Sequence, residues 1–418
     1  MKSLYFAAHQ FWPVTSGARL RNYQLASQLA TRASVTFVEM CIRGDGQQIP
    51  SGESNVASVV TLHKDTYTVS KVFRGLVGPT PVTVLNCWSP RSASQLAKVL
   101  KSSQFDTVQI AGTQLMAYLP VVQDSAERAA IVVDWHNIES ELMWRFTESA
   151  GNWAKKIAAG RTAKLIERAE DRLLDSCALH TVTSERERQK LLARRPKANI
   201  AVIPNGVDTH YFAPKKTTDA CRPNGHGGLK RSVLFVGSMD YHANIDAVLW
   251  FSRVAWPEIA RKHPELQFTI VGRDPAPEIL ALQSDRIQIT GTVEDVRPFY
   301  AGAVAAIAPI RMGSGTRLKI LEAMAAGVPV VSTRLGVEGL DVADNAHLLL
   351  AEDGREIAAA IGQILSSAET GHRLSSLARA LVVARYDWST IGAHLSRIHN
   401  DLARARWPQP ARNVPCFV

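Results

Sequence analysis

Residues 309–333 read PIRMGSGTRLKILEAMAAGVPVVST, a glycine-rich loop followed by a helix-forming and then a strand-forming stretch. Gly313 and Gly315 allow the backbone to turn tightly and to approach a ligand closely. Thr316 is expected to cap a helix over residues 317–326, and the apolar VPVVST that follows is expected to form a buried strand. Loop, helix and strand in this order predict one unit of an α/β protein with a parallel sheet.

The start of this expected helix has the chemistry of an anion site. Backbone N–H groups and the helix dipole favour negative charge there. Arg317 and Lys319 add full positive charges, and Arg311 adds a third nearby. Glu322 lies about 8 Å further along an otherwise apolar helix, because a helix rises about 1.5 Å per residue. Phosphate at the helix start and a sugar hydroxyl near the carboxylate predict a nucleotide-sugar site; the alternative is an ordinary turn with solvated basic side chains.

The composition describes an ordinary globular protein with more than one core. The chain has 418 residues, of which 46% are hydrophobic and 21% charged. There is no stretch of about 18 apolar residues that would span a membrane, and the first residues read as a strand rather than a signal peptide. Five scattered cysteines without a Cys-x-x-Cys pair argue against a structural zinc and favour reduced thiols, so we expect a cytoplasmic protein.

The net charge of +10 is concentrated in the first half of the chain. Residues 1–205 hold 25 Lys and Arg against 17 Asp and Glu, whereas residues 206–418 hold 23 against 21. The densest basic segment, residues 153–172, reads as an amphipathic helix. It could face the anionic inner surface of a membrane or an anionic acceptor, or its charges could simply be solvated. Nucleic acid is not an expected partner, because neither a basic–aromatic RNA-binding motif nor zinc-finger spacing occurs.

Strands and helices alternate along nearly the whole chain, which predicts two Rossmann-like domains with parallel sheets. The expected parts are a first domain over 1–203, a proline- and glycine-rich linker over 204–230, a second domain over 231–385, and a last helix and tail over 386–418. One long helical stretch is expected over residues 139–175. Ligands of open α/β sheets bind beyond the carboxyl ends of the strands, so the loops there predict a cleft between the domains.

A series of motifs occurs in order along the chain. They are PVTSGARLR at 13–21, VVDWHN at 132–137, IPNGVD at 203–208, FVGSMDY at 235–241, IVG at 270–272, GTVEDVRP at 291–298, and the segment at 309–333. This series resembles the family 4 glycosyltransferases over essentially the whole chain. The most specific motifs lie within residues 203–340.

The resemblance implies a GT-B fold, which has two Rossmann-like domains with a cleft between them and a C-terminal helix that crosses back onto the first domain. It also implies a hexosyltransferase of polysaccharide or glycolipid biosynthesis. Such an enzyme moves a sugar from a nucleoside-diphosphate sugar to an acceptor hydroxyl with retention, and it generally needs no metal or other cofactor. The donor would lie in the second domain, and a sugar or lipid-linked acceptor would contact the first. We expect a cytoplasmic protein, and the basic first half of the chain favours an acceptor at an anionic membrane surface, with which the protein could make peripheral contact.

The resemblance also assigns roles to single residues. His136 is expected near the reacting sugar as a catalytic residue, and the alternative is a capping or core histidine. Glu322 matches the second of two glutamates that the family separates by seven residues, and that glutamate binds the ribose. The full set of expected donor-binding residues is Gly17, Gly237, Ser238, Asn244, Gly272, Thr292, Val293, Arg311, Ser314, Gly315, Thr316 and Glu322. No metal ligand is expected.

Three positions depart from the family pattern. Ser314 stands in place of the first glutamate, Ser238 in place of an arginine, and Asn244 in place of a lysine. Two cations that would bind the diphosphate are therefore missing from their usual places. Our hypothesis is that this charge has moved to Arg317 and Lys319, which would act in catalysis by stabilising the leaving diphosphate.

Other functions remain open at this point. A sugar-nucleotide epimerase can share the fold and the nucleotide site, and a non-catalytic protein could bind a nucleotide sugar without turnover. A nicotinamide dehydrogenase is a poor match, because the first loop contains only Gly17 where Gly-x-Gly-x-x-Gly is required. The donor sugar, its base and the acceptor are not specified by the sequence.

Overall fold

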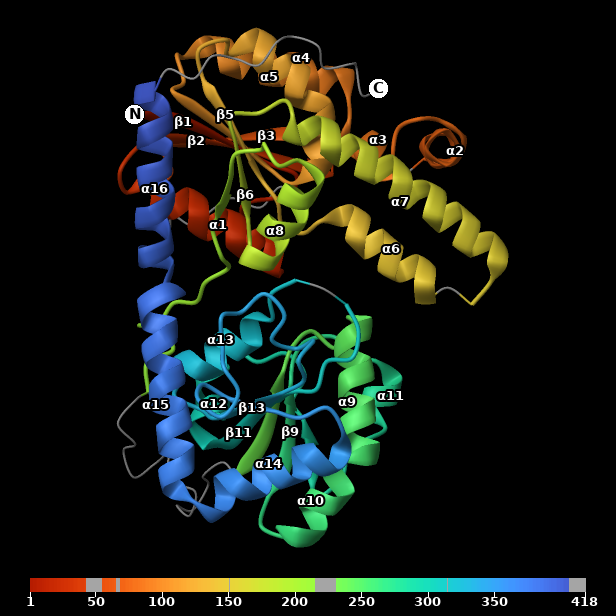
Figure 1. Ribbon diagram of the computed structural model, residues 1–418, viewed down its shortest axis with the longest axis vertical. Helices are drawn as coiled ribbons and strands as arrows, with labels where there is room; N and C mark the ends of the chain where they lie inside the picture. The colour runs from red at the N-terminus through yellow and green to blue at the C-terminus, as the bar shows by residue number, and fades with distance from the viewer. Residues whose placement is uncertain (43–54, 65–67, 150, 215–230, 314, 406–418) are drawn as a thin grey trace. The chain divides into compact units, whose positions relative to one another are not determined.

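The computed structural model describes residues 1–42, 55–64, 68–149, 151–214, 231–313 and 315–405. The chain divides into two compact units: Met1–Pro204 together with the segment that starts at Trp388, and Asn205–Asp387. Each unit contains one parallel sheet with helices packed against it (Figure 1). The two parallel sheets confirm the predicted α/β class.

In the described part of the first unit, the sheet has seven parallel strands in the order β3-β2-β1-β4-β5-β6-β7. The strands are β1 Lys2–Ala7, β2 Ser34–Ile42, β3 Ser58–Lys64, β4 Thr107–Ala111, β5 Ala130–Asp134, β6 Leu179–Val182 and β7 Ile200–Val202. The central strands β4, β5 and β6 are buried along their whole length, as expected for a parallel sheet covered on both faces. The helices are α1 Gly17–Ala30, α2 Val69–Val77, α3 Val82–Cys87, α4 Pro90–Ser102, the 3-10 helix η1 Thr113–Tyr118, α5 Leu119–Ser125, α6 Glu139–Ser149, α7 Trp153–Leu174 and α8 Glu185–Arg194.

The C-terminal helix α16 (Trp388–Ala405) packs on the first unit. His399 of this helix is buried, with Nδ1 2.9 Å from Thr107 Oγ1 and Nε2 2.9 Å from Gln109 Oε1 of β4. Gly392 lets α16 lie against α1, because a Cβ atom at this position would overlap the side chain of Gln28. The crossover helix that the family resemblance implied is therefore present.

The second unit has a six-stranded parallel sheet in its described part, in the order β10-β9-β8-β11-β12-β13. The strands are β8 Ser232–Val236, β9 Gln267–Val271, β10 Ile287–Ile289, β11 Ala303–Ala308, β12 Val330–Ser332 and β13 Leu349–Leu350. The helices are α9 His242–Val254, α10 Trp256–Lys262, α11 Pro277–Leu280, α12 Arg297–Gly302, α13 Leu318–Ala325, α14 Gly354–Ser366 and α15 Ala368–Arg385. One continuous apolar core fills the space between the sheet and these helices.

The glycine-rich loop leads into α13 one residue later than predicted. Arg317, rather than Thr316, occupies the N-cap position, with an extended backbone and no side-chain cap, so the predicted role of Thr316 as N-cap is wrong. Gly313 and Gly315 have φ angles of 93° and 82°, which side-chain-bearing residues rarely adopt. The loop turns tightly at these glycines, as the sequence predicted.

The single helix predicted over residues 139–175 is also wrong. The structure has two helices there, α6 and α7, with a break at Gly151 and Asn152. The side chain of Asn152 accepts a hydrogen bond from the backbone N–H of Ala154 at 2.8 Å and so caps a new helix. None of the helices in the described ranges is long and apolar enough to cross a membrane.

Candidate active site

The residues predicted to bind the donor gather at one edge of the second sheet. Strands β10, β9, β8 and β11 are neighbours, and parallel strands end at the same edge. The predicted residues lie in the segments that directly follow these strands. Thr292 and Val293 follow β10, and Gly272 follows β9. Gly237, Ser238 and Asn244 follow β8, and Arg311, Gly315 and Thr316 follow β11. Ser314 lies outside the described residues. The predicted residues thus share one edge, and their role in donor binding stays a prediction.

Two glycines let the chain segments at this edge approach each other. A Cβ atom on Gly272 would overlap the carbonyl oxygen of Gly237, so only glycine allows the β8 and β9 loops to pack as they do. A Cβ atom on Gly237 would lie 2.8 Å from Nζ of Lys319. Glycine at position 237 therefore leaves room for an ammonium group at the end of β8.

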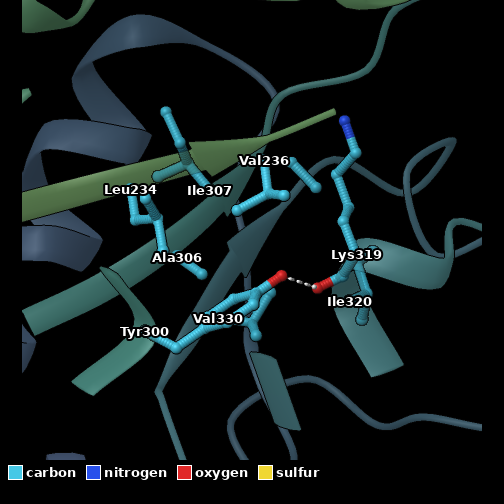
Figure 2. Close-up of a pocket in the computed structure, with 9 residues that line it drawn as sticks. Leu234, Val236, Tyr300, Ala306, Ile307, Lys319, Ile320 and Val330 are labelled. Atoms are coloured by element: carbon cyan, nitrogen blue, oxygen red, sulfur yellow. Dashed lines mark hydrogen bonds between the residues drawn. The ribbon is translucent and has the colours of Figure 1, made fainter. Parts of the chain in front are cut away.

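Lys319 brings this ammonium group from α13. Its Nζ donates to Asn244 Oδ1 at 2.8 Å and lies 3.7 Å from the centre of the Phe235 ring. The Nδ2 of Asn244 donates in turn to the carbonyl oxygen of Ser238 at 2.8 Å. Figure 2 shows the Lys319 side chain directed toward the end of β8 and away from Tyr300. A lysine nitrogen thus lies next to the position where the family resemblance expects a lysine and this chain has Asn244.

The protein itself stabilises the charge on Lys319 poorly. Burial and the nearby Arg317 charge lower the pKa of Lys319 well below its ordinary value, and Glu322 opposes this shift only in part. Among the described residues, the hydrogen-bond partner of Nζ is the Asn244 amide rather than a carboxylate. An anionic group bound here would raise the pKa of Lys319 and hold it as ammonium. The arrangement is therefore suited to an anionic ligand.

A second cation at this edge, Arg273, was missed by the sequence reasoning. Its Nε donates to Ser238 Oγ at 2.9 Å, and this hydroxyl donates to Asp240 Oδ1 at 2.5 Å. The Arg273 side chain is 43% exposed, so it can contact a ligand. Arg273 could have been predicted from its position, because it directly follows Gly272 at the carboxyl end of a strand. Its guanidinium lies beside the position where the family has an arginine and this chain has Ser238.

Arg311 and Arg317 differ in their surroundings. Arg311 forms a two-point ion pair with Asp246 at 2.6 and 3.0 Å, and its guanidinium lies 5.3 Å from the centre of the Trp250 ring. Because Asp246 already compensates this charge, Arg311 contributes less to an anion site than its sequence position suggested. Arg317 is half-buried at the start of α13, and its Nη2 donates to the carbonyl oxygen of Met312 at 3.4 Å.

Glu322 lies further along α13 and is partly buried. Its Oε2 accepts a hydrogen bond from the Tyr300 hydroxyl at 3.0 Å, while the described residues provide no hydrogen bond to Oε1. Burial raises the pKa of Glu322, and the Tyr300 hydrogen bond and the Lys319 charge oppose that shift. A cavity of about 10 Å³ between Tyr300 and the strands holds no sugar-sized ligand (Figure 2).

In the first unit, a buried ion pair lies at the carboxyl end of β5. Arg21 of α1 donates from Nε and Nη2 to the carboxylate of Asp134, at 2.9 and 2.7 Å. Thr181 Oγ1 donates to the same carboxylate at 2.6 Å, and Arg21 Nη2 also donates to the carbonyl oxygen of Ile203 at 2.8 Å. Burial alone would raise the pKa of Asp134, but the Arg21 charge and these hydrogen bonds lower it below its ordinary value. The pair is a closed network.

His136 lies two residues after Asp134. Its Nε2 is 3.1 Å from Asn22 Oδ1 and 3.5 Å from Asp134 Oδ2. An amide oxygen can only accept, so Nε2 carries the proton and Nδ1 is the acceptor nitrogen of the ring. Burial lowers the pKa of His136 to about 4, with Asp134 raising it and Arg21 lowering it, so the ring is neutral at neutral pH.

Gly17 is the exposed first residue of α1.

A pocket of about 200 Å³ in the first unit was not predicted. Polar groups from several segments line it, among them His9, Lys64, Asn86, Thr113, Gln114 and Glu139. Burial and the Glu170 charge raise the pKa of Glu139 to about 7. Burial, followed by the Lys64 charge, lowers the pKa of His9 to about 4. Amides, hydroxyls and a carboxyl group that titrates near neutrality suit a ligand rich in hydroxyls.

Solved structures with the same arrangement of two parallel sheets identify the fold. Sucrose-phosphate synthase from Thermosynechococcus elongatus is similar with a TM-score of 0.71, over 97% of this chain and 100% of that chain, at 18% identity. The HepE protein of Anabaena in complex with UDP is similar with a TM-score of 0.69, over 96% and 100%, at 16% identity. These likenesses show the fold, which is the GT-B fold of glycosyltransferases.

The family follows from the sequence. The family model described as Glycosyltransferase Family 4 matches residues 15–211, and the model described as Glycosyl transferases group 1 matches residues 230–367. Together the two models span most of the chain. The chain therefore belongs to glycosyltransferase family 4, which confirms the resemblance that its motifs indicated.

Several relatives are mannosyltransferases by name. Phosphatidyl-myo-inositol mannosyltransferase of Mycolicibacterium smegmatis is 32% identical over 211 residues, 49% of this chain and 52% of the relative. Its counterpart in Mycobacterium tuberculosis is 30% identical over 48% of this chain and 54% of the relative. The chain thus spans about half the length of these relatives. A GDP-mannose-dependent alpha-(1-6)-phosphatidylinositol monomannoside mannosyltransferase of M. smegmatis is 24% identical over 78% of this chain and 84% of the relative.

Proposed function

We propose that this protein is a retaining glycosyltransferase that moves a sugar from a nucleoside-diphosphate sugar to an acceptor hydroxyl. The observation that carries the proposal is the half-buried ammonium of Lys319, held 2.8 Å from Asn244 Oδ1 at a strand end packed with glycines. Because the described partner of Nζ is an amide rather than a carboxylate, a bound diphosphate would pair with the ammonium and raise its lowered pKa. Glu322, on the same helix, offers a carboxylate oxygen to a ribose hydroxyl. The related mannosyltransferases and the UDP-glucose complex of HepE support this class of donor.

Loss of the nucleoside diphosphate develops negative charge on its phosphate oxygens. Cations already in place stabilise that charge more in the transition state than in the ground state. Lys319, Arg317 and Arg273 would supply the positive charge, and the first turn of α13 would supply backbone N–H groups. The acceptor hydroxyl would attack the face of the sugar from which the diphosphate leaves, and the leaving phosphate would take its proton. Neutral His136 would contact the reacting sugar through a hydrogen bond.

The acceptor would bind in the first unit, in the pocket that contains Glu139. Relatives that act on phosphatidylinositol favour a lipid-linked acceptor, so the pathway would be glycolipid or polysaccharide synthesis. Such an acceptor lies at a membrane surface. The protein would therefore work at the cytoplasmic face of the membrane in peripheral contact with anionic lipids, to which its basic first half would be attracted.

We further propose that transfer needs no bound metal, because cationic side chains neutralise the diphosphate. In the described portions of the chain, no group of three or more His, Cys, Asp and Glu side chains could hold a metal ion. Transfer should therefore continue at an unchanged rate in excess EDTA. A loss of activity that added Mg²⁺ restores would contradict this part of the proposal.

The proposal is tested with UDP-, GDP-, ADP- and dTDP-sugars in thermal-shift and transfer assays. One donor should raise the unfolding temperature. The Arg317→Ala/Lys319→Ala variant should lose at least about tenfold in donor affinity or turnover, which corresponds to about 1.4 kcal/mol. Lys262→Ala is a matched control, because this exposed lysine of α10 pairs with Glu258 and lies outside the proposed site.

The outcomes separate the alternatives. Unchanged kinetics in the double variant would refute the role of Arg317 and Lys319. Isomerisation of the donor sugar without any acceptor would indicate an epimerase. Donor binding with no turnover on any acceptor would indicate a non-catalytic binding protein.

A further inference from the structure

Helix α2 (Val69–Val77) presents apolar side chains to solvent. Val69 is 89% exposed, Phe73 63% and Val77 62%, and Val72 is also exposed. The spacing of these residues places them on one face of a helix. A soluble amphipathic helix normally buries such a face in the core, so its exposure indicates a contact with another apolar surface.

Figure 1 shows the α6–α7 hairpin extending beside α2, and this hairpin also carries exposed aromatic side chains. Trp153 and Ile157 in the first turns of α7 are 76% and 65% exposed. Phe146 and Trp144 near the end of α6 are 55% and 39% exposed. Arg161 of α7 joins the hairpin to α2, because its Nη2 donates to the carbonyl oxygen of Gly78 at 2.7 Å. We name α2, the end of α6 and the first half of α7 the α2–α7 surface.

Basic residues accompany these apolar side chains. Residues 68–82 and 151–168 together contain seven Lys and Arg but only one acidic residue, Glu167. Lys155 and Lys156 stand beside Trp153 and Ile157 in the exposed first turns of α7. Exposed apolar side chains with lysine and arginine around them are typical of protein segments that lie in the interface of an anionic membrane.

A basic hollow lies where α2 and α7 meet. It has a volume of about 410 Å³, and its lining is Val77, Gly78 and Pro79 after α2, and Arg161, Lys164, Leu165 and Arg168 of α7. Three of these seven side chains are cationic, and Val77 links the hollow to the apolar face of α2. A phospholipid is complementary to a cationic hollow beside an apolar face, because its phosphate lies directly above its acyl chains.

We propose that the α2–α7 surface docks on a bilayer of anionic phospholipids, with Phe73 and Trp153 in the acyl boundary and a lipid phosphate in the hollow lined by Lys164 and Arg168. A second copy of the chain fits this surface poorly, because it would bring the same excess of positive charge. This surface would be the site of the membrane contact in the proposed function, and the purpose of the contact rests on that proposal. It does not depend on whether sugar transfer occurs.

Sedimentation of the full chain with vesicles tests the proposal. Vesicles of phosphatidylcholine mixed with phosphatidylglycerol should bind at least about tenfold more protein than phosphatidylcholine alone, and salt should weaken the binding. Phe73→Ser/Trp153→Ser and Lys164→Glu/Arg168→Glu should each weaken binding to the mixed vesicles at least about tenfold. Lys98→Glu/Lys101→Glu on exposed positions of α4 makes the same charge change outside the surface and should have little effect.

Each result supports or overturns the inference. Equal losses in the α4 control, or equal binding to both kinds of vesicle, would overturn it. So would a dimer in solution that Phe73→Ser/Trp153→Ser dissolves, because the surface would then serve a second copy. Thermal shift by a nucleotide sugar, measured on the same variants, keeps the two proposals apart. If the protein binds a nucleotide sugar but no vesicles, only the proposed docking surface is rejected. If it binds vesicles but no nucleotide sugar, only the proposed transferase function is rejected.

Discussion

The charged groups at the carboxyl ends of the two sheets differ in how their charge is compensated. In the first unit, Arg21 and Asp134 form a two-point ion pair that Thr181 completes. Burial would lower the pKa of Arg21, but Asp134 raises it above its ordinary value. In the second unit, Lys319 has a depressed pKa and an amide oxygen as its partner. The first charge is compensated by a carboxylate, whereas the second has an amide oxygen as its hydrogen-bond partner among the described residues.

Under the proposed function, this difference separates a structural charge, that of Arg21, from a binding charge, that of Lys319. A closed buried pair positions the elements that it joins, here α1 and β5, and breaking it leaves one charge buried alone. A cation that the protein stabilises poorly costs stability in the ligand-free state and gains most when an anion binds. Strongly perturbed groups of the second kind are typical of functional sites.

Asp134→Ala should produce the largest effect. The guanidinium of Arg21 would stay buried without its carboxylate partner, while it still donates to the carbonyl oxygens of Ile203 and Pro204. Removal of one partner from a buried pair costs about 3–5 kcal/mol. We expect the free energy of unfolding, measured by urea denaturation of the first unit, to fall by that amount.

The control for Asp134→Ala is Asp175→Ala. That aspartate pairs with Arg195 at 3.2 Å, but its side chain is 61% exposed, and exposed pairs contribute about 0–1 kcal/mol. A loss below about 1 kcal/mol in Asp134→Ala, equal to that of the control, would show that the buried pair is not structural.

The fold and the edge that carries the site could be predicted from local sequence. The alternation of apolar strands with helices predicted parallel sheets, and the glycines at 313 and 315 predicted the tight loop that their positive φ angles confirm. The break in the helix at Asn152 could also have been predicted, because asparagine is a preferred residue at the N-cap of a helix and here follows a glycine. It was missed because the helical pattern on both sides is long.

The partners at the site could not be predicted in the same way. Lys319 and Asn244 are 75 positions apart, and Arg273 and Ser238 are 35 positions apart. Their contacts depend on which strands are neighbours and on where each side chain points, and local patterns determine neither. The motif comparison showed that two cations were absent from their usual places, and only the structure showed which side chains lie there instead.

Lys319→Met should have a smaller effect than Asp134→Ala, and of opposite sign. Methionine removes the half-buried charge of Lys319 together with its cation–π contact with the Phe235 ring. Without donor, we expect the unfolding temperature of the second unit to rise by about 2–4 °C, the shift that about 1 kcal/mol produces at this size. Since the folded-state pKa of Lys319 is depressed, the unfolded state binds more protons, and the cost of the charge is present at neutral pH.

The pH dependence checks this explanation for Lys319→Met. The difference in unfolding temperature between the variant and the natural chain should shrink as the pH rises past the ordinary lysine pKa, because both folded and unfolded lysine are then neutral. A lower unfolding temperature in Lys319→Met at neutral pH would instead mean that the hydrogen bond to Asn244 outweighs the buried charge, and the contrast with Arg21 would not hold.

Glu139 should give the smallest effect, and it tests the acceptor side of the comparison. Burial and the Glu170 charge raise its pKa to about 7, so the carboxyl group becomes charged as the pH rises through neutrality. A charged acceptor holds a hydroxyl more strongly than a neutral one by about 1 kcal/mol. Because the group is only partly titrated at these limits, the acceptor KM should fall about three- to fourfold between pH 6 and pH 8. Glu139→Gln should remove this change. His136 should contribute nothing in that range, because its pKa is about 4. If the change persists in Glu139→Gln, the acceptor does not use this pocket, and the first unit would hold only compensated charges.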